Sequence, residues 1–248
     1  MAERDKQIAS QMLQYYHEQR DAGDQDLDFL PFIKSDPNAY LLGVVYNQGM
    51  SADITWQIPE CLNDRLGHFD INRIASSDIE LLERAFEQKP TLHRYWRTMA
   101  SHTKNVAQLL VDKYEASASN VWNDNPTVEA LYERLTEFKG VGPKKANMAL
   151  RALALFFQVP IRNLEDIDIP VDVHVRRIFQ RTGFSDSDST EDIVKAARRV
   201  HPEFPAELDL PSWLIGRRWC HAQNPDCDNC VLVDNCRKII YQANDKVE

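Results

Sequence analysis

The segment from residue 135 to residue 153 reads LTEFKGVGPKKANMALRAL and is the most informative stretch of the chain about its fold. A helical pattern ends at Gly140-Val141-Gly142, and Pro143 can start a second helix because proline is favoured at a first helical position. Two glycines so close together allow a tight turn with positive φ, and Val141 between them can pack against both helices. The segment therefore predicts a helix, a hairpin and a second helix.

The start of the second helix has the properties of an anion site. Free N–H groups at a helix N-terminus attract anions, and the helix dipole adds to this attraction. Lys144 and Lys145 stand in that first turn, where a positive charge opposes the dipole unless an anion is bound. A bound phosphate would remove the conflict, whereas a plain helix–helix turn is the alternative on these residues alone.

The rest of the chain reads as all-α. Only 8 of its 248 residues are glycine, which disfavours a sandwich or barrel with many tight turns. Helical patterns cover residues 4–19, 39–62, 70–88, 91–114 and 189–200. The chain has no run of 18 apolar residues and no apolar leader, so we expect an intracellular protein without a membrane span.

The charge is distributed unevenly along the chain. The net charge of −9 argues against a nucleic-acid partner, but acids concentrate in residues 18–36 and 185–192. Bases gather in four groups without acids, at residues 93–104, 139–151, 176–181 and 217–218. Any one group can be a solvated helix face, whereas the four together favour a basic groove on an acidic body.

Four of the five cysteines lie within 17 residues near the end of the chain. The segment reads CHAQNPDCDNCVLVDNC and holds Cys220, Cys227, Cys230 and Cys236. Disulfides are a poor explanation in a compartment that keeps thiols reduced. A structural zinc ion and an iron–sulfur cluster both take four thiolates, and the spacing leaves that choice open. The distant Cys61 is predicted to be a small buried residue.

Asp172 stands within the segment IPVDVHVRRIF, at a boundary between loop and helix. A helix N-cap is its ordinary role, but an acid and a lysine near a phosphate site also suggest chemistry at a sugar. The order of FKGVGPKKAN, VDVHVRR and the four-cysteine loop resembles the endonuclease III-like helix–hairpin–helix (HhH-GPD) DNA glycosylases. The resemblance extends over roughly residues 37–240.

The resemblance implies an all-α fold of two helical domains that flank a DNA-binding groove, with an iron–sulfur cluster loop near the C-terminus. Residues 37–157 would form the domain that ends in the helix–hairpin–helix, and residues 158–248 the cluster domain. The N-terminal helix and linker, residues 1–36, would pack on the cluster domain. The resemblance also favours a [4Fe-4S] cluster over zinc at Cys220, Cys227, Cys230 and Cys236.

The activity implied by the resemblance is removal of a base in DNA base excision repair, with associated AP lyase activity. Lys144 matches the lysine of bifunctional members, which attacks C1′ of the flipped nucleotide, forms a Schiff base and cleaves the strand by β-elimination. We expect Lys144 to be partly buried, because burial favours the neutral amine. Asp172 matches the family's essential aspartate, which stabilises cationic character on the sugar.

The implied partner is double-stranded DNA with a damaged or modified base or an abasic site. The resemblance also implies a monomer that works in the cytoplasm, in association with the nucleoid. Gln48 aligns with the glutamine that fills the gap left by the flipped base, although a capping or buried polar role is the alternative. The departures from the family include Lys145 in place of a threonine and Lys139 in place of a proline. The expected DNA contacts are Gly140, Val141, Gly142, Lys145, Gln48, Lys104 and Arg176.

Two further hypotheses remain open. The chain could be a monofunctional glycosylase for an alkylated, mismatched or hypermodified base, in which Lys144 forms no covalent bond. It could also be a non-catalytic DNA-binding protein, but a protein that only binds DNA needs neither Lys144 nor Asp172. The sequence does not identify the excised base.

Overall fold

The computed structural model describes residues 3–24 and 28–239 and divides the chain into two compact units. Phe29–Arg162 form one, here called the hairpin unit. Met1–Asp28 and Asn163–Glu248 form the other, here called the cysteine unit. The described residues contain α-helices, short 3₁₀ helices and one isolated β-bridge, which confirms the all-α prediction. None of the helices in these described residues has the length and apolar character needed to cross a membrane.

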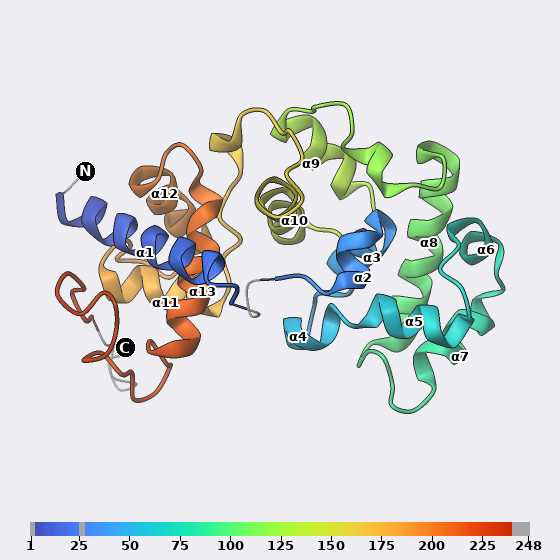
Figure 1. The fold of residues 1–248 in the computed structure, drawn as a ribbon, viewed down its shortest axis with the longest axis horizontal. Helices are drawn as coiled ribbons and strands as arrows, with labels where there is room; N and C mark the ends of the chain where they lie inside the picture. The colour runs from blue at the N-terminus through green and yellow to red at the C-terminus, as the bar shows by residue number, and fades with distance from the viewer. Residues whose placement is uncertain (1–2, 25–27, 240–248) are drawn as a thin grey trace, which may run out of the picture. The chain divides into compact units, whose positions relative to one another are not determined.

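The hairpin unit is built around the helix α3, Pro37–Tyr46 (Figure 1). The residues of α3 are buried from Ala39 onward. The hydroxyl of Tyr40 donates a hydrogen bond of 2.9 Å to the carbonyl of Ala149, which ties α3 to α10. The helices of this unit are α2 (Pro31–Ser35), α3, α4 (Ala52–Thr55), α5 (Ile58–Leu66), α6 (Ile71–Ser76), α7 (Ile79–Glu87), α8 (Trp96–Tyr114), η2 (Ala118–Val121), α9 (Val128–Thr136) and α10 (Pro143–Leu155).

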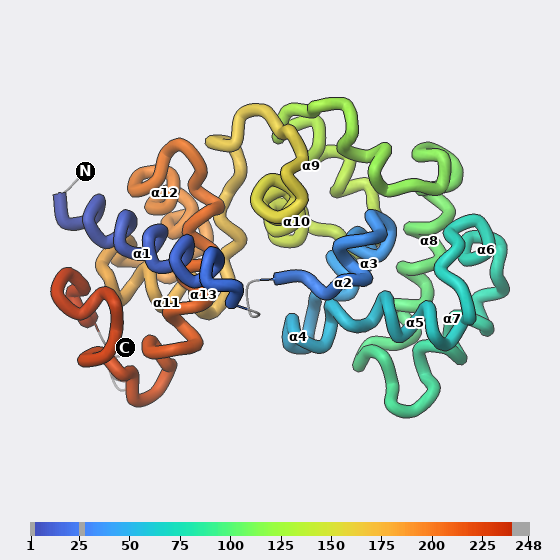
Figure 2. The backbone as a smooth tube through the Cα atoms, in the orientation of Figure 1, coloured from blue at the N-terminus to red at the C-terminus, as the bar shows by residue number. Residues whose placement is uncertain are grey.

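The cysteine unit joins the N-terminal helix to the C-terminal third of the chain (Figure 2). Ile8, Met12 and Tyr16 of the first helix are fully buried in a core shared with Phe179 and Ile215. This burial of apolar side chains is the main term that holds the distant segments together. The helices are α1 (Glu3–Asp21), η3 (Leu164–Asp166), α11 (Val173–Thr182), α12 (Thr190–Val200), η4 (Pro205–Leu208) and α13 (Asp209–Arg218).

Two of the predicted helices are wrong as single elements. The pattern at 39–62 is interrupted because α3 ends at Tyr46 and Gly49 adopts a φ of +65°. The pattern at 70–88 is two helices, since α6 ends at Ser76 and the chain is extended at Ser77 before α7 begins. Apolar periodicity reports which side chains face the core, and it continues across a break when the next helix faces the same core.

Candidate functional site

The turn between α9 and α10 is a hairpin whose centre is buried. The backbone N–H of Val141 donates to the carbonyl of Phe138 at 3.0 Å, and the Val141 side chain is only 6% exposed. Gly140 has a φ of +93°, which only glycine adopts readily. Pro143 is the first residue of α10, and the carbonyl of Gly142 accepts the first bond of the helix from the N–H of Ala146 at 2.9 Å.

The two glycines of the hairpin have different reasons to be glycine. A Cβ atom on Gly140 would lie 2.6 Å from Nδ1 of His102 and 3.3 Å from Cγ1 of Val45, so the protein itself excludes a side chain there. Gly142 has an ordinary extended backbone with a φ of −99°, and a Cβ on it would meet nothing within 4 Å. The fold therefore requires Gly140, whereas Gly142 leaves open space in front of the N-terminus of α10.

This difference predicts opposite effects for two substitutions. Gly140→Ala should destabilise the protein by about 2 kcal/mol or more, because a positive φ and a steric clash with His102 act together. Gly142→Thr should leave the thermal midpoint nearly unchanged, since threonine is a good N-cap residue. It should instead weaken binding to duplex DNA, because the new side chain blocks close approach of a phosphate. Thermal melting and DNA titration of both variants check this, and a normal melting curve for Gly140→Ala would contradict it.

Lys144 and Lys145 stand next to each other in the first turn of α10 but have different surroundings. Lys144 is exposed, so the partial burial expected for it is not found. Lys145 is half-buried, and its Nζ donates to the carbonyl of Val45 at 2.6 Å and to Oε1 of Gln48 at 3.0 Å. Burial lowers the pKa of Lys145 to about 8. The structure thus joins Lys145 to Gln48, a contact that the sequence did not indicate.

Asp172 is the N-cap of α11 in the cysteine unit. Its Oδ1 accepts hydrogen bonds of 2.8 Å from the backbone N–H groups of both His174 and Val175. The carboxylate therefore stabilises the start of the helix, where negative charge is favoured by the dipole. The capping role does not exclude a second role, because both bonds fall on one of the two carboxylate oxygens.

Arg177 connects the helix of Asp172 to the start of the cysteine loop. Its Nε donates to the carbonyl of Cys220 at 2.6 Å, and a terminal nitrogen donates to Nδ1 of His174 at 2.9 Å. Since arginine has only donors, Nδ1 of His174 must accept, and the imidazole is neutral with its proton on Nε2. Burial also lowers the pKa of His174. The sequence analysis placed His174 and Arg177 in the VDVHVRR motif but did not predict these contacts.

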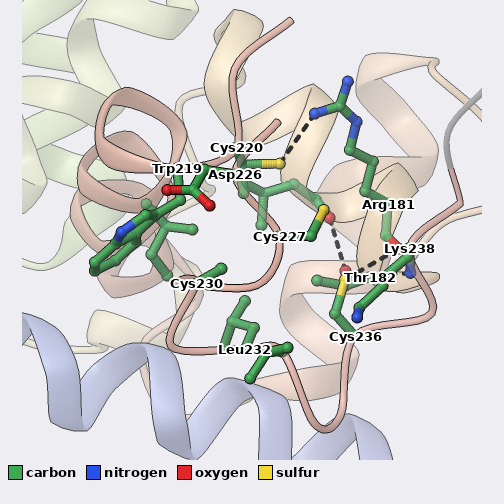
Figure 3. A pocket seen from close by; sticks show the side chains of 13 residues that line it. Arg181, Thr182, Trp219, Cys220, Asp226, Cys227, Cys230, Leu232, Cys236 and Lys238 are labelled. Atoms are coloured by element: carbon green, nitrogen blue, oxygen red, sulfur yellow. Dashed lines mark hydrogen bonds between the residues drawn. The ribbon is translucent and has the colours of Figure 1, made fainter. Parts of the chain in front are cut away.

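The four cysteines of the loop line one pocket of the cysteine unit (Figure 3). Arg181 donates to Sγ of Cys220 at 3.2 Å, and the backbone N–H of Lys238 donates to Sγ of Cys236 at 3.4 Å. Burial, together with the smaller effect of repulsion from negative charge on the nearby cysteines, raises the pKa of the Cys230 thiol to about 11. Four thiols thus share one partly buried site in which N–H groups already point at sulfur.

Several basic side chains of the four groups already bind other residues of the protein. Lys104 donates to the carbonyl of Ser77 at 2.6 Å, and Arg176 lies 3.4 Å from Oγ1 of Thr190. Arg218 pairs with Asp24, which removes much of its charge from the surface. Arg94 is exposed in a loop of the hairpin unit. The basic surface is therefore smaller than the sequence groups suggested.

Comparison with known proteins agrees with the hairpin and the helical fold. Residues 42–203 match the family described as "HhH-GPD superfamily base excision DNA repair protein". Endonuclease III of Sulfolobus acidocaldarius is 29% identical over 181 residues, which span 71% of this chain and 70% of the relative. The family match, over residues 42–203, includes the hairpin and Asp172.

Two solved structures share the fold. A trapped endonuclease III–DNA covalent intermediate superposes with a TM-score of 0.67 at 23% identity, over 96% of this chain and 97% of the other. A thermostable thymine-DNA glycosylase superposes with a TM-score of 0.64 at 14% identity, over 94% and 95% of the two chains. The chain belongs to the HhH-GPD superfamily of base excision DNA repair proteins, and it is similar to endonuclease III in sequence and in fold.

Proposed function

We propose that this glycosylase acts on double-stranded DNA with a damaged or modified base and cleaves the resulting abasic strand through Lys144. The observation that carries the proposal is the exposed Lys144 in the first turn of α10, next to the open space at Gly142. A phosphate at the N-terminus of α10 would interact with free N–H groups and the helix dipole, which brings the DNA backbone to the lysine. In this proposal, C1′ of a nucleotide in that DNA would come within reach of the amine of Lys144, which lies on the same turn.

In the proposed reaction the neutral amine of Lys144 attacks C1′ of the flipped nucleotide. The bond between C1′ and the base breaks, and the base leaves with the bonding electron pair and takes up a proton. The attached amine then loses a proton and the bond between C1′ and O4′ breaks. O4′ keeps the bonding electron pair and takes up a proton, which leaves a Schiff base between Lys144 and the open-chain sugar. Removal of a C2′ proton then expels the 3′ phosphate, which is the β-elimination step. Asp172 would stabilise the positive charge that develops on the sugar, as a fixed charge in a site of low dielectric.

Five other residues that are expected to contact DNA have two different roles in this proposal. Gly140, Val141 and Gly142 would present the hairpin backbone to a phosphate, with Val141 acting as the packed centre. Lys104 and Arg176 would contribute long-range attraction at most, because both already have partners inside the protein. We propose that the protein acts as a monomer, and that the hairpin unit and the cysteine unit correspond to its two helical domains.

We further propose that Cys220, Cys227, Cys230 and Cys236 hold a [4Fe-4S] cluster. The family resemblance favours this cluster, and the four cysteines line one pocket of the cysteine unit. A single tetrahedral zinc would need sulfur atoms about 3.8 Å apart, given Zn–S bonds of about 2.3 Å. A cluster distributes its four thiolates over four irons and accepts a wider arrangement. When bound, it would cross-link the loop and supply a redox-active centre, while Arg181 and the N–H of Lys238 hydrogen-bond to ligand sulfurs.

The cluster proposal predicts a brown protein with about four irons per chain and a broad visible absorption band. Cys220→Ser should lower the iron content and destabilise the cysteine loop, because it removes one ligand. Cys61→Ser is the matched control and should keep the full iron content, since Cys61 belongs to α5 of the other unit. Iron and zinc analysis of protein purified without oxygen gives the answer. Colourless protein with one zinc per chain would contradict the proposal.

A screen of duplex oligonucleotides tests the proposed activity. Each duplex carries one oxidised, alkylated or mismatched base, or an abasic site, and is incubated with the purified protein. Base removal appears as strand breaks after hot alkali, and lyase activity as breaks without alkali. We expect direct incision of the abasic duplex and of at least one damaged duplex. Base removal without direct incision would instead support the monofunctional alternative.

A further inference from the structure

The segment between α3 and α4 carries Gln48 at the centre of a tight reversal. The N–H of Gln48 donates to the carbonyl of Tyr46 at 2.7 Å, and Gly49 follows with a φ of +65°. A Cβ on Gly49 would lie 2.7 Å from Cε2 of Tyr95, so the backbone at this point packs directly on the Tyr95 ring. The reversal is therefore held against the loop before α8.

Two side chains of that loop bind the backbone of the reversal. His93 is fully buried and Nε2 lies 3.0 Å from the carbonyl of Gln48. The N–H of Tyr95 donates to Nδ1 of His93 at 3.0 Å, so Nδ1 accepts and Nε2 carries the proton that it donates to Gln48. Arg94 donates to the carbonyl of Gly49 at 3.1 Å. The backbone on both sides of the Gln48 side chain is thus fixed.

Lys145 binds the side chain of the same residue from α10. Its ammonium satisfies the carbonyl of Val45, which is in the last turn of α3 and would otherwise lack a helical partner. The same ammonium donates to Oε1 of Gln48 at 3.0 Å. An ammonium has only donors, so the amide oxygen must face Lys145 and the amide NH₂ must face away from it. The lysine sets both the position and the orientation of the amide.

We propose that Lys145 is a positioning residue that holds Gln48 in the orientation in which it enters the DNA gap. This inference rests on the proposed function and on the role that the family resemblance implies for Gln48, which is to fill the space left by the flipped base. A free glutamine side chain loses rotamer freedom when it is inserted, and a side chain held beforehand loses less. The proposal explains why a cation stands at residue 145 although its charge is turned toward the protein. Burial of the amine, which lowers the pKa of Lys145 to about 8, agrees with this inward placement.

A double-mutant cycle with Gln48 tests the proposal. The variants are Lys145→Met, Gln48→Ala and the double variant. Methionine keeps the approximate length of the lysine side chain but has no hydrogen-bond donor. The measured quantity is the discrimination between two duplexes of the same sequence. It is the dissociation constant for the undamaged duplex divided by that for the abasic duplex. We expect each single variant to lose about tenfold of this discrimination, the effect of one hydrogen bond to a charged group. The double variant should lose no more than Gln48→Ala alone, because Lys145 acts through Gln48.

Two controls separate positioning from other roles. Lys139→Met removes an exposed cation of the same hairpin and should weaken binding to both duplexes equally, leaving the ratio unchanged. Lys145→Arg keeps donors at the site and should retain much of the discrimination, even if Lys145→Met also lowers the thermal midpoint. Additive losses in the double variant, or a Lys145→Met ratio equal to wild type, would overturn the positioning role while the proposed function stands. Equal binding of both duplexes by the wild type would overturn the proposed function and this inference together.

Discussion

Replacing Lys144 by glutamine should abolish the covalent adduct that borohydride traps between the protein and abasic DNA. The adduct forms by reduction of the Schiff base, and glutamine has no amine to form one. Strand cleavage without alkali should fall below detection for the same reason. Binding of abasic duplex should change little by comparison, because Lys144 is one exposed cation among several on the hairpin unit. Gel analysis of the trapped adduct, with a parallel binding titration, makes the measurement.

Lys145→Gln is the matched control, since it changes the neighbouring residue of the same turn. It should bind abasic DNA more weakly than the wild type but still give the adduct at saturating protein. Two results would contradict the assignment. An adduct from Lys144→Gln that disappears in Lys145→Gln would transfer the nucleophile to Lys145, whose lowered pKa of about 8 makes its neutral form accessible. Base removal by the wild type without any adduct would leave a monofunctional glycosylase.

Replacing Asp172 by asparagine should slow base removal by a factor on the order of 100 or more, with little change in stability. The structure makes this variant informative because Asp172 caps α11 through Oδ1 alone. Asparagine has an equivalent oxygen and is an equally good N-cap residue, so the helix keeps its start. What the substitution removes is the negative charge that would stabilise a cationic sugar. Single-turnover rates of base removal and thermal midpoints measure the two effects separately.

Asp172→Ala provides the comparison, because it removes the cap and the charge together. It should cost about 1 kcal/mol of stability, the ordinary value of an N-cap, in addition to the loss of rate. If Asp172→Asn retains full activity while Asp172→Ala is destabilised, the aspartate is a helix cap and nothing more. Equal instability of both variants would show that the cap needs the charge, and the rate loss could then not be assigned to the sugar.

The hairpin could be predicted from the sequence because its determinants are local. A positive φ at Gly140 and a first helical position at Pro143 depend on the chemistry of those residues themselves. The N-cap at Asp172 is equally local, since the accepting oxygen and its donors lie within three residues. The four cysteines are also close in sequence, so one short loop carries all four to the pocket that they line.

Other features depended on contacts between distant segments. Lys144 and Lys145 are both lysines and are adjacent in sequence. The local sequence therefore does not show which of the two side chains becomes buried when α10 packs. Consecutive residues of a helix point in directions about 100° apart, and the neighbouring helix decides which of the two is buried. The break after Tyr46 was likewise hidden, because the apolar pattern continues across it.

The sequence by itself thus determined the all-α class, the hairpin and the family to which the chain belongs, because each follows from residue types at short, fixed spacing. Only the tertiary structure decided that Lys145 reaches Gln48, 97 residues away, and that Arg177 reaches Cys220, 43 residues away. Such bonds form where packing of apolar helix faces brings two segments together. That packing is a property of the whole folded unit and leaves no local pattern at either residue.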